Sequence, residues 1–88
     1  MSKTFFIIGS NSFSGSNFTK LVLDKGFKVI AISRSRELDK KFLAYKNSKN
    51  LKNFKFHKYD LNKDLKNIKK LLIKNKPQYV VNYAAQGM

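Results

Sequence analysis

The sequence contains no cysteine, so it can form neither a disulfide framework nor a thiolate metal site. Its only histidine is His57, so no cluster of histidines can bind a metal ion. No apolar run reaches the roughly 20 residues of a membrane helix. The N-terminus lacks the apolar region of a secretory signal, because polar residues return over 9–12. We therefore expect a cytoplasmic protein with no metal site and no membrane partner.

Acidic residues are scarce. They number 5 against 19 lysines and arginines, which gives a formal net charge of +14. This balance suits binding to nucleic acid, an anionic membrane surface or phosphorylated ligands. It also fits the codon bias of a lysine- and asparagine-rich proteome, because the lysines are scattered over 46–76 rather than gathered in a tail.

The hydrophobic fraction of 42% is ordinary for a folded protein, and 88 residues form one small domain or part of a larger one. Continuous apolar runs predict buried strands over 4–8, 27–33 and 78–85, and an alternating pattern predicts an edge strand over 54–60. Apolar residues at helical spacing predict helices over 14–26, 36–46 and 63–75. Strands that alternate with helices indicate an α/β fold, a parallel sheet with helices on both faces.

Two of these helices are predicted to be amphipathic. The middle helix has Leu38, Phe42 and Tyr45 at positions i, i+4 and i+7. The last helix has Leu65, Ile68 and Leu72 on one stripe. Both stripes are expected to face the sheet.

The segment GSNSFSG, residues 9–15, follows a predicted strand and opens a predicted helix. This is the setting in which a glycine-rich turn binds a dinucleotide. Gly9 can form the tight turn, and Gly15 allows the helix to pack close to the strand. Backbone N–H groups around Phe13 and Ser14 would then point at a pyrophosphate, aided by the helix dipole. The alternative is a structural surface loop.

The spacing of Gly9, Ser12 and Gly15 resembles the G-x-x-G-x-x-G turn of extended short-chain dehydrogenase/reductases. These are NAD(P)-dependent epimerases and dehydratases that act on nucleotide sugars. Asp60 followed by Leu61 resembles the family's adenine-binding step. The ending over 84–86, Ala-Ala-Gln, is most similar to sugar-nucleotide 4,6-dehydratases of the GDP-mannose type. The sequence departs from the family at Ser12, which replaces a glycine and whose hydroxyl can hydrogen-bond a phosphate.

The resemblance implies that residues 1–88 are the N-terminal half of an NAD(P)-binding Rossmann domain. The expected fold is a doubly wound parallel sheet truncated to about four strands, in the order 3-2-1-4. The implied cofactor-binding residues are Gly9, Asn11, Ser12, Phe13, Ser14, Gly15, Ser33, Arg34, Arg36, Asp60, Leu61, Ala84, Ala85 and Gln86.

No catalytic residue is expected in this chain. The family's catalytic Tyr-x-x-x-Lys and its sugar-binding domain come after the matched part. The strings over 45–49 and 59–63 have the Tyr-x-x-x-Lys form but lie at other places in the predicted fold. The nucleotide-sugar substrate is therefore expected only in a full-length relative, and the chain is interpreted as a fragment of such an enzyme.

The residues after the second predicted strand favour NADP over NAD as the cofactor. Family members that prefer NAD have an acid there, which binds the ribose 2′-hydroxyl. This chain has Ser33, and both of its arginines, Arg34 and Arg36, follow at once. A guanidinium matches a 2′-phosphate bidentately. The alternative is that both arginines are solvated loop cations.

Three other outcomes stay open. Phe54, Phe56 and Tyr59 alternate with lysines, as in a strand that stacks nucleic-acid bases, but alternation places both phenylalanines on one face, where they would pack against helices. A second alternative is that the chain is a non-functional remnant. The outer edge of the last strand, over 79–81, is expected to be unpaired and to promote self-association or binding of a partner chain.

Overall fold

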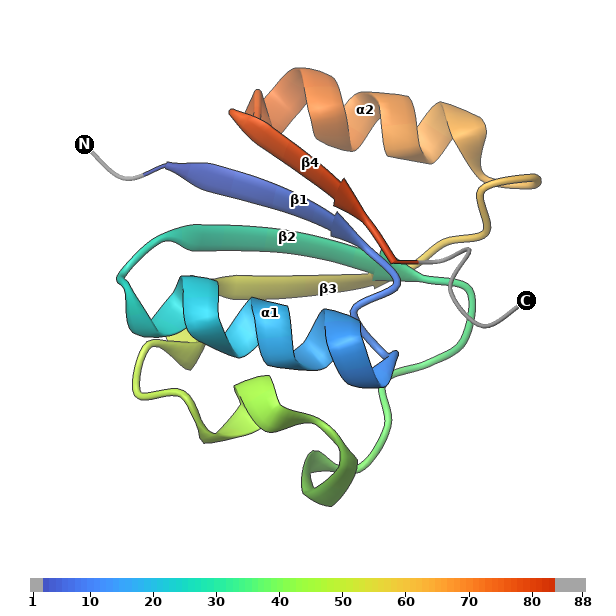
Figure 1. Cartoon of the computed structure of the whole chain (residues 1–88). Coiled ribbons are helices and arrows are strands. Elements are labelled where there is room, and N and C mark those ends of the chain that lie inside the picture. The colour runs from blue at the N-terminus through green and yellow to red at the C-terminus, as the bar shows by residue number, and fades with distance from the viewer. Residues whose placement is uncertain (1–2, 84–88) are drawn as a thin grey trace.

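The computed structural model describes residues 3–83, apart from the side chain of Lys40. Its centre is a four-stranded parallel sheet in the order β3-β2-β1-β4 (Figure 1), which confirms the predicted strand order. The central strand β1 pairs with β2 on one side and with β4 on the other. The strands are β1 (Thr4–Ile8), β2 (Lys28–Ser33), β3 (Phe54–Lys58) and β4 (Tyr79–Asn82).

Helices cover both faces of the sheet, as predicted. The helix α1 (Phe13–Asp24) packs on one face and α2 (Leu65–Asn75) on the other (Figure 1). Successive strand residues point to opposite faces, so Ile7 belongs to the cluster under α1, whereas its neighbour Phe6 belongs to the cluster under α2. The sequence of β1 is continuously apolar because the strand is covered on both faces.

Two hydrophobic clusters stabilise these layers. The larger one joins β1 and β2 to α1 and to the segment between β2 and β3; its buried members are Ile7, Val22, Leu23, Val29, Ala31, Leu43 and Tyr45. The smaller one joins the other face of the sheet to α2; its buried members are Phe6, Ile30, Ile32 and Ile68. Both clusters meet at β1 and β2, so these two strands form the rigid base of the molecule.

The predicted helix over 36–46 is wrong. The chain instead forms two short 3₁₀ turns, η1 (Lys40–Phe42) and η2 (Ala44–Asn47), which Leu43 separates in an extended conformation. This break turns both Leu43 and Tyr45 into the core and leaves Phe42 61% exposed. The Tyr45 hydroxyl donates a hydrogen bond to Glu37 Oε2 at 2.5 Å. Burial, followed by the nearby Glu37, raises the pKa of Tyr45, so the phenol stays protonated.

The prediction that the last strand is buried is also wrong. Val80 is 59% exposed, because β4 is one of the two edge strands among the described residues and α2 packs over β1 and β2 instead. Leu65 is also exposed, although it was expected on the buried stripe of α2. Ile68 and Leu72 do pack against the smaller cluster, as predicted.

Self-association through the outer edge of β4 stays a prediction. An unpaired strand edge can add a further strand, and the exposed side chains of Tyr79 and Val80 flank it. The charge of +14 opposes association of two copies, so we expect self-association to increase with salt, which screens the repulsion. Sedimentation velocity over a range of protein and salt concentrations measures this. A monomer under every condition would contradict the prediction.

Candidate functional site

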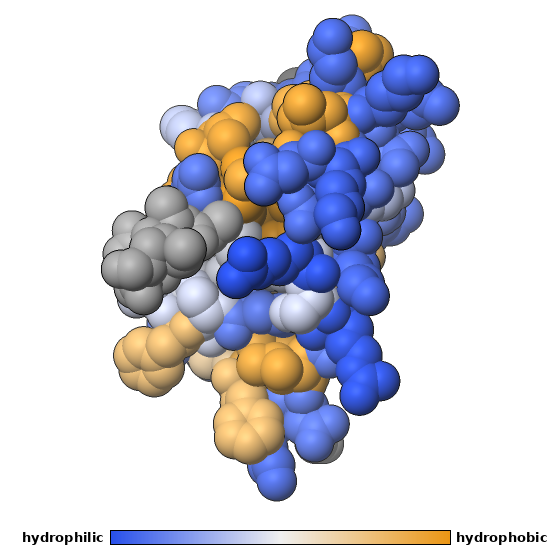
Figure 2. Space-filling model, turned by 90° about the vertical axis from the view of Figure 1, so that its right-hand side faces the viewer, coloured by the Kyte–Doolittle hydropathy of each residue, from blue (hydrophilic) through white to orange (hydrophobic). Residues whose placement is uncertain are grey.

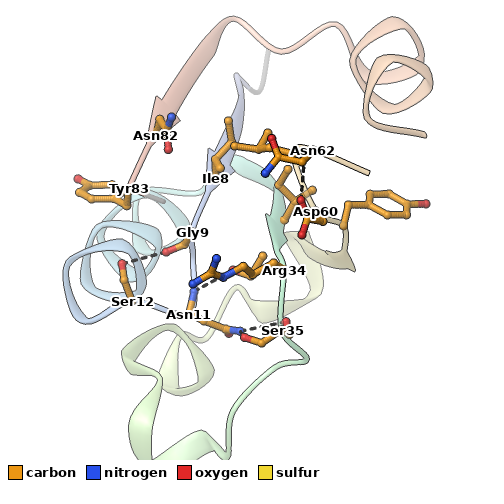
Figure 3. A pocket seen from close by; sticks show the side chains of 14 residues that line it. Ile8, Gly9, Asn11, Ser12, Arg34, Ser35, Asp60, Asn62, Asn82 and Tyr83 are labelled. Carbon is orange, nitrogen blue, oxygen red and sulfur yellow. Dashed lines mark hydrogen bonds between the residues drawn. The ribbon is translucent and has the colours of Figure 1, made fainter. Parts of the chain in front are cut away.

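A pocket of about 400 Å³ opens at the carboxyl ends of the strands, where α/β sheets commonly bind ligands (Figure 3). Figure 2 looks onto this end of the molecule and shows strongly hydrophilic residues at its centre, with hydrophobic residues on either side. The pocket is lined by Ile8, Gly9, Asn11, Ser12, Ile32, Ser33, Arg34, Ser35, Tyr59, Asp60, Leu61, Asn62, Asn82 and Tyr83.

The turn that leads from β1 into α1 is held by the hydroxyl of Ser12. Gly9 has φ of 86°, a left-handed conformation that glycine adopts without strain. Ser12 Oγ donates a hydrogen bond to the Gly9 carbonyl at 2.9 Å and accepts one from the Gly15 N–H at 2.9 Å. Ser12 is therefore the N-cap of α1. Ser12, which departs from the family pattern, therefore stabilises the turn through hydrogen bonds to both Gly9 and Gly15.

Gly15 lies where the first turn of α1 crosses the end of β1. A Cβ atom built on Gly15 would come within 2.2 Å of the Gly9 carbonyl oxygen and 2.8 Å of Ser12 Oγ. Real Cβ atoms essentially never approach backbone this closely. Only glycine fits here, as the sequence predicted, because any side chain would push the helix away from the strand.

The N–H groups at the start of α1 are available to a ligand. The amides of Gly15 and Ser16 bond to Ser12, whereas those of Phe13 and Ser14 have no partner among the described residues. The first N–H groups of a helix lack intrahelical acceptors and carry the positive end of its dipole. The Phe13 side chain is 84% exposed and leaves these amides uncovered by the core.

Asn11 ties the turn to the loop after β2. Its side-chain Nδ2 donates to the carbonyl oxygens of Ser35 and Arg36, at 3.2 and 2.9 Å, and its backbone N–H donates to Ser33 Oγ at 3.3 Å. Two buried oxygens at this turn, Ser10 Oγ and Asn11 Oδ1, have no hydrogen-bond partner within the described part of the chain. Buried polar atoms are normally paired, so the turn keeps unused hydrogen-bonding capacity.

Arg34 is the one cation among the residues that line the pocket. Ser33 before it is buried, whereas Arg34 is exposed, and Figure 3 shows its guanidinium reaching toward the turn at Gly9 and Asn11. The ion pairs among residues 3–83 are Lys20 with Asp24 and Lys46 with Glu37. Arg34 therefore forms no direct ion pair with a carboxylate of the described residues, and Asp60 is the one carboxylate that shares its pocket.

On the opposite wall, Asp60 is held in place by the loop after β3. Its Oδ1 accepts a hydrogen bond from the Asn62 N–H at 2.7 Å, and its own N–H donates to Asp64 Oδ2 at 2.7 Å. These bonds fix the carboxylate at the edge of the pocket, beside Leu61. An acceptor in this position suits an amino or hydroxyl group of a ligand.

The structure brings together seven of the predicted site residues as pocket lining: Gly9, Asn11, Ser12, Ser33, Arg34, Asp60 and Leu61. Gly15 does not line the pocket but packs against Gly9 and Ser12 of the turn. Phe13 and Ser14 do not line it either, but their backbone amides follow directly after the lining residue Ser12. Arg36 does not line the pocket, and only its carbonyl oxygen is engaged, by Asn11. The predicted residues at 84–86 lie outside the described residues.

Sequence reasoning missed several lining residues, notably Ser35, Asn62, Asn82 and Tyr83. Each directly precedes or follows a motif that was recognised. Because the carboxyl ends of parallel strands converge at one edge, every residue just after a predicted strand was a candidate. The predicted strand boundaries indicated only part of this set, because Asn82 and Tyr83 lie inside the strand predicted over 78–85.

Other features of the described residues do not form a second site of the predicted kinds. Phe54 and Phe56 pack against the larger cluster, where Phe54 lies 4.3 Å from the Tyr45 ring, so neither is a free platform for bases. No helix within residues 3–83 is long and apolar enough to cross a membrane. The same residues contain no group of three or more potential metal ligands.

Comparison with known proteins bears on this arrangement. The family described as GDP-mannose 4,6 dehydratase matches residues 6–88. The match confirms the resemblance that the turn and the Asp60–Leu61 step indicated. Comparison with curated proteins finds no significant match.

Solved structures share the fold. The Bordetella bronchiseptica enzyme WbmH, in complex with NAD+, is 26% identical with a TM-score of 0.77 over 98% of this chain. A dTDP-glucose 4,6-dehydratase from Bacillus anthracis, in complex with NAD, is 21% identical with a TM-score of 0.71 over 97%. UDP-glucose 4-epimerase from Thermotoga maritima, with UDP-glucose, is 20% identical with a TM-score of 0.73 over 96%. The chain spans only 25–27% of the length of these proteins.

The contact at Gly15 generates a stability prediction. Gly15→Ala is expected to lower the free energy of unfolding by about 1–3 kcal/mol, because the new methyl group overlaps the Gly9 carbonyl. Thermal unfolding measures the loss. Ser14→Ala, at an exposed position of the same turn, is the matched control and should change stability by less than about 0.5 kcal/mol. Equal stability of the two variants would show that α1 does not approach β1 this closely.

Proposed function

We propose that this chain, which belongs to the GDP-mannose 4,6-dehydratase family, binds a nicotinamide dinucleotide across the carboxyl ends of its strands. The observation that carries the proposal is the start of α1, which follows the pocket-lining Ser12 and in which the amides of Phe13 and Ser14 have no partner among the described residues. Unpaired helix-start amides favour anions such as a pyrophosphate.

Ser12 would act through the turn rather than through a phosphate. Its hydroxyl already donates to Gly9 and accepts from Gly15, which orients the first turn of α1 and keeps its amides outward. A glycine in this place would leave the Gly15 N–H without its cap. We therefore assign Ser12 a positioning role, and the backbone of Phe13 and Ser14 the contact with phosphate.

The remaining parts of the dinucleotide would lie along the pocket. Asp60 and Leu61 would contact the adenine end, because both line the wall fixed by the loop after β3. The cofactor contacts predicted for residues 84–86 rest on the family resemblance alone, because these residues lie outside the described structure. When bound, a nicotinamide ring supplies or accepts hydride, while the residues described here bind and orient the dinucleotide.

We further propose that NADP is preferred to NAD. Ser33 brings no negative charge to the end of β2, and its hydroxyl accepts the Asn11 N–H. Arg34 follows it, exposed in the pocket and without a direct ion pair among the described residues. A 2′-phosphate placed there would gain a charge-assisted contact. WbmH and the B. anthracis dehydratase were solved with NAD, so the preference rests on the residues of this chain.

In the larger context, residues 1–88 are proposed to be the cofactor-binding half of a dinucleotide-binding domain. The enzyme concerned would act on a nucleotide sugar, as the names of the matching proteins indicate for those proteins. Its acid–base residues and its sugar site would come from other segments. In such an enzyme the fold described here would position the cofactor.

Cofactor preference is tested by Arg34→Ala. A charge-assisted contact of about 1.5–3 kcal/mol corresponds to roughly ten- to a hundred-fold tighter binding of NADP than of NAD. Arg34→Ala should remove most of this preference and change the affinity for NAD little. Isothermal titration calorimetry with both cofactors, at two salt concentrations, measures the effect, since salt screens diffuse attraction more than a local contact.

Arg36→Ala is the matched comparison, because it removes the same charge two residues away and outside the lining of the pocket. It should weaken NADP binding much less than Arg34→Ala. Equal losses in both variants would point to general attraction by a chain of net charge +14. Equal affinity of the unmodified chain for NAD and NADP would refute the preference, while failure to bind either cofactor would refute the proposed site.

A further inference from the structure

A second pocket, of about 460 Å³, lies at the opposite end of the sheet, where the strands begin and α2 ends (Figure 1). Its walls come from β1, β2, β3, α2 and the short 3₁₀ turn η3 (Leu51–Asn53). We propose that this basal pocket binds a small ligand with clustered phosphate groups. It is lined by Thr4, Lys28, Ile30, Lys52, Asn53, Lys55, Lys74 and Asn75.

Four lysines and no acidic residue line the basal pocket. Elsewhere in residues 3–83, lysines form ion pairs with Asp24 and Glu37, but none of these four does. Like charges gathered around one hollow repel one another and raise its affinity for anions. Amide and hydroxyl groups from the two asparagines and the threonine add neutral hydrogen-bonding partners for phosphate oxygens.

The topology, rather than one lysine-rich segment, gathers these charges. Lys28 and Lys55 lie on the same face of the sheet as Ile30, because alternate residues of a strand share a face and Lys55 pairs in register with Ile30. Lys74 reaches this face from the last turn of α2. The negative end of the α2 dipole accounts for a lysine at position 74, but it does not account for those contributed by β2, β3 and η3.

The lysines of the basal pocket also affect the pKa of His57. It lies on β3 two residues after Lys55, so both side chains are on the α2 face. Partial burial lowers the pKa of His57, and the positive charges of Lys55 and Lys74 lower it further. An anion bound between these lysines would offset their effect and raise the pKa. Because His57 is the only histidine, its titration is a site-specific reporter.

The form of the pocket favours a compact polyphosphate over a nucleic-acid strand. Its volume falls in the range of about 300–1,000 Å³ typical of small-molecule sites. No aromatic residue lines it, so it offers no surface on which bases could stack. The phosphates could belong to an inorganic polyphosphate or to a nucleotide, and both share the chemistry that the lysines recognise.

Inorganic tripolyphosphate is the direct probe. Titrating it into the chain while following the His57 ring protons by NMR should raise the pKa of His57 in a saturable way. The double variant K55Q/K74Q should weaken binding by about tenfold or more. It should also unfold at a higher temperature than the unmodified chain when no anion is present, because it loses the repulsion among the lysines.

The matched control is K66Q/K69Q, which removes the same charge from exposed positions of α2 that do not line the pocket. It should change tripolyphosphate affinity by less than about twofold, as expected for diffuse attraction that salt screens. Equal weakening in both double variants would overturn the proposal, and so would an unchanged His57 pKa at saturating tripolyphosphate.

Parallel titrations with ATP and with a single-stranded oligonucleotide identify the source of the phosphates. ATP that binds as tightly as tripolyphosphate would assign the site to the triphosphate alone, and tighter binding of ATP would assign it to a nucleotide. Affinity that rises with oligonucleotide length and exceeds that of both small anions would contradict the small-ligand proposal in favour of nucleic acid. NADP added in excess should not displace the probe, because its proposed pocket lies at the other end of the sheet.

Discussion

The close contact between the first turn of α1 and the end of β1 is the constraint on which the candidate site depends. It requires a residue without a side chain at Gly15, and in this chain the Ser12 hydroxyl supports it by bridging the Gly9 carbonyl and the Gly15 amide. With the helix held this close, its first amides point past the strand end, where a ligand across the sheet would lie. The substitution of Ser12 for a family glycine is thereby reconciled with a tight turn. The Ser12 hydroxyl caps the Gly15 N–H at the start of α1, a hydrogen bond that a glycine at this position could not form.

A second consequence is the coupling of the turn to the loop after β2. Asn11 donates hydrogen bonds to the carbonyl oxygens of Ser35 and Arg36, so the segment carrying Arg34 is positioned by the same turn that presents the helix amides. The elements proposed to contact pyrophosphate and ribose phosphate are therefore one unit. Basic side chains line the pockets at both ends of the sheet, but within the described residues only the carboxyl-end pocket combines its one cation, Arg34, with helix amides nearby and with a carboxylate, Asp60.

The sequence predicted the two central strands because β1 and β2 are covered on both faces, which makes their apolar runs continuous. The strand order came from the family resemblance. It failed over 36–46, because Leu43 takes an extended conformation that sets Tyr45 into the core, and helical spacing does not reveal such a break. It also failed for β4, because local hydrophobicity cannot tell which neighbours cover a strand. Motif residues of the site were found, whereas Asn62 and Tyr83 were missed because their place depends on tertiary convergence of loops.

The most direct test of the account is to locate the dinucleotide by the amide groups it perturbs. In ¹H–¹⁵N correlation spectra of the labelled chain titrated with NADP, we expect the amides of Phe13 and Ser14 to shift most. Amides of Ser33, Arg34 and Leu61 should shift with the same dissociation constant. Shifts confined to the basal pocket around Lys55 and Lys74, or spread evenly over the lysine-rich surface, would contradict the assignment of the turn as the binding site.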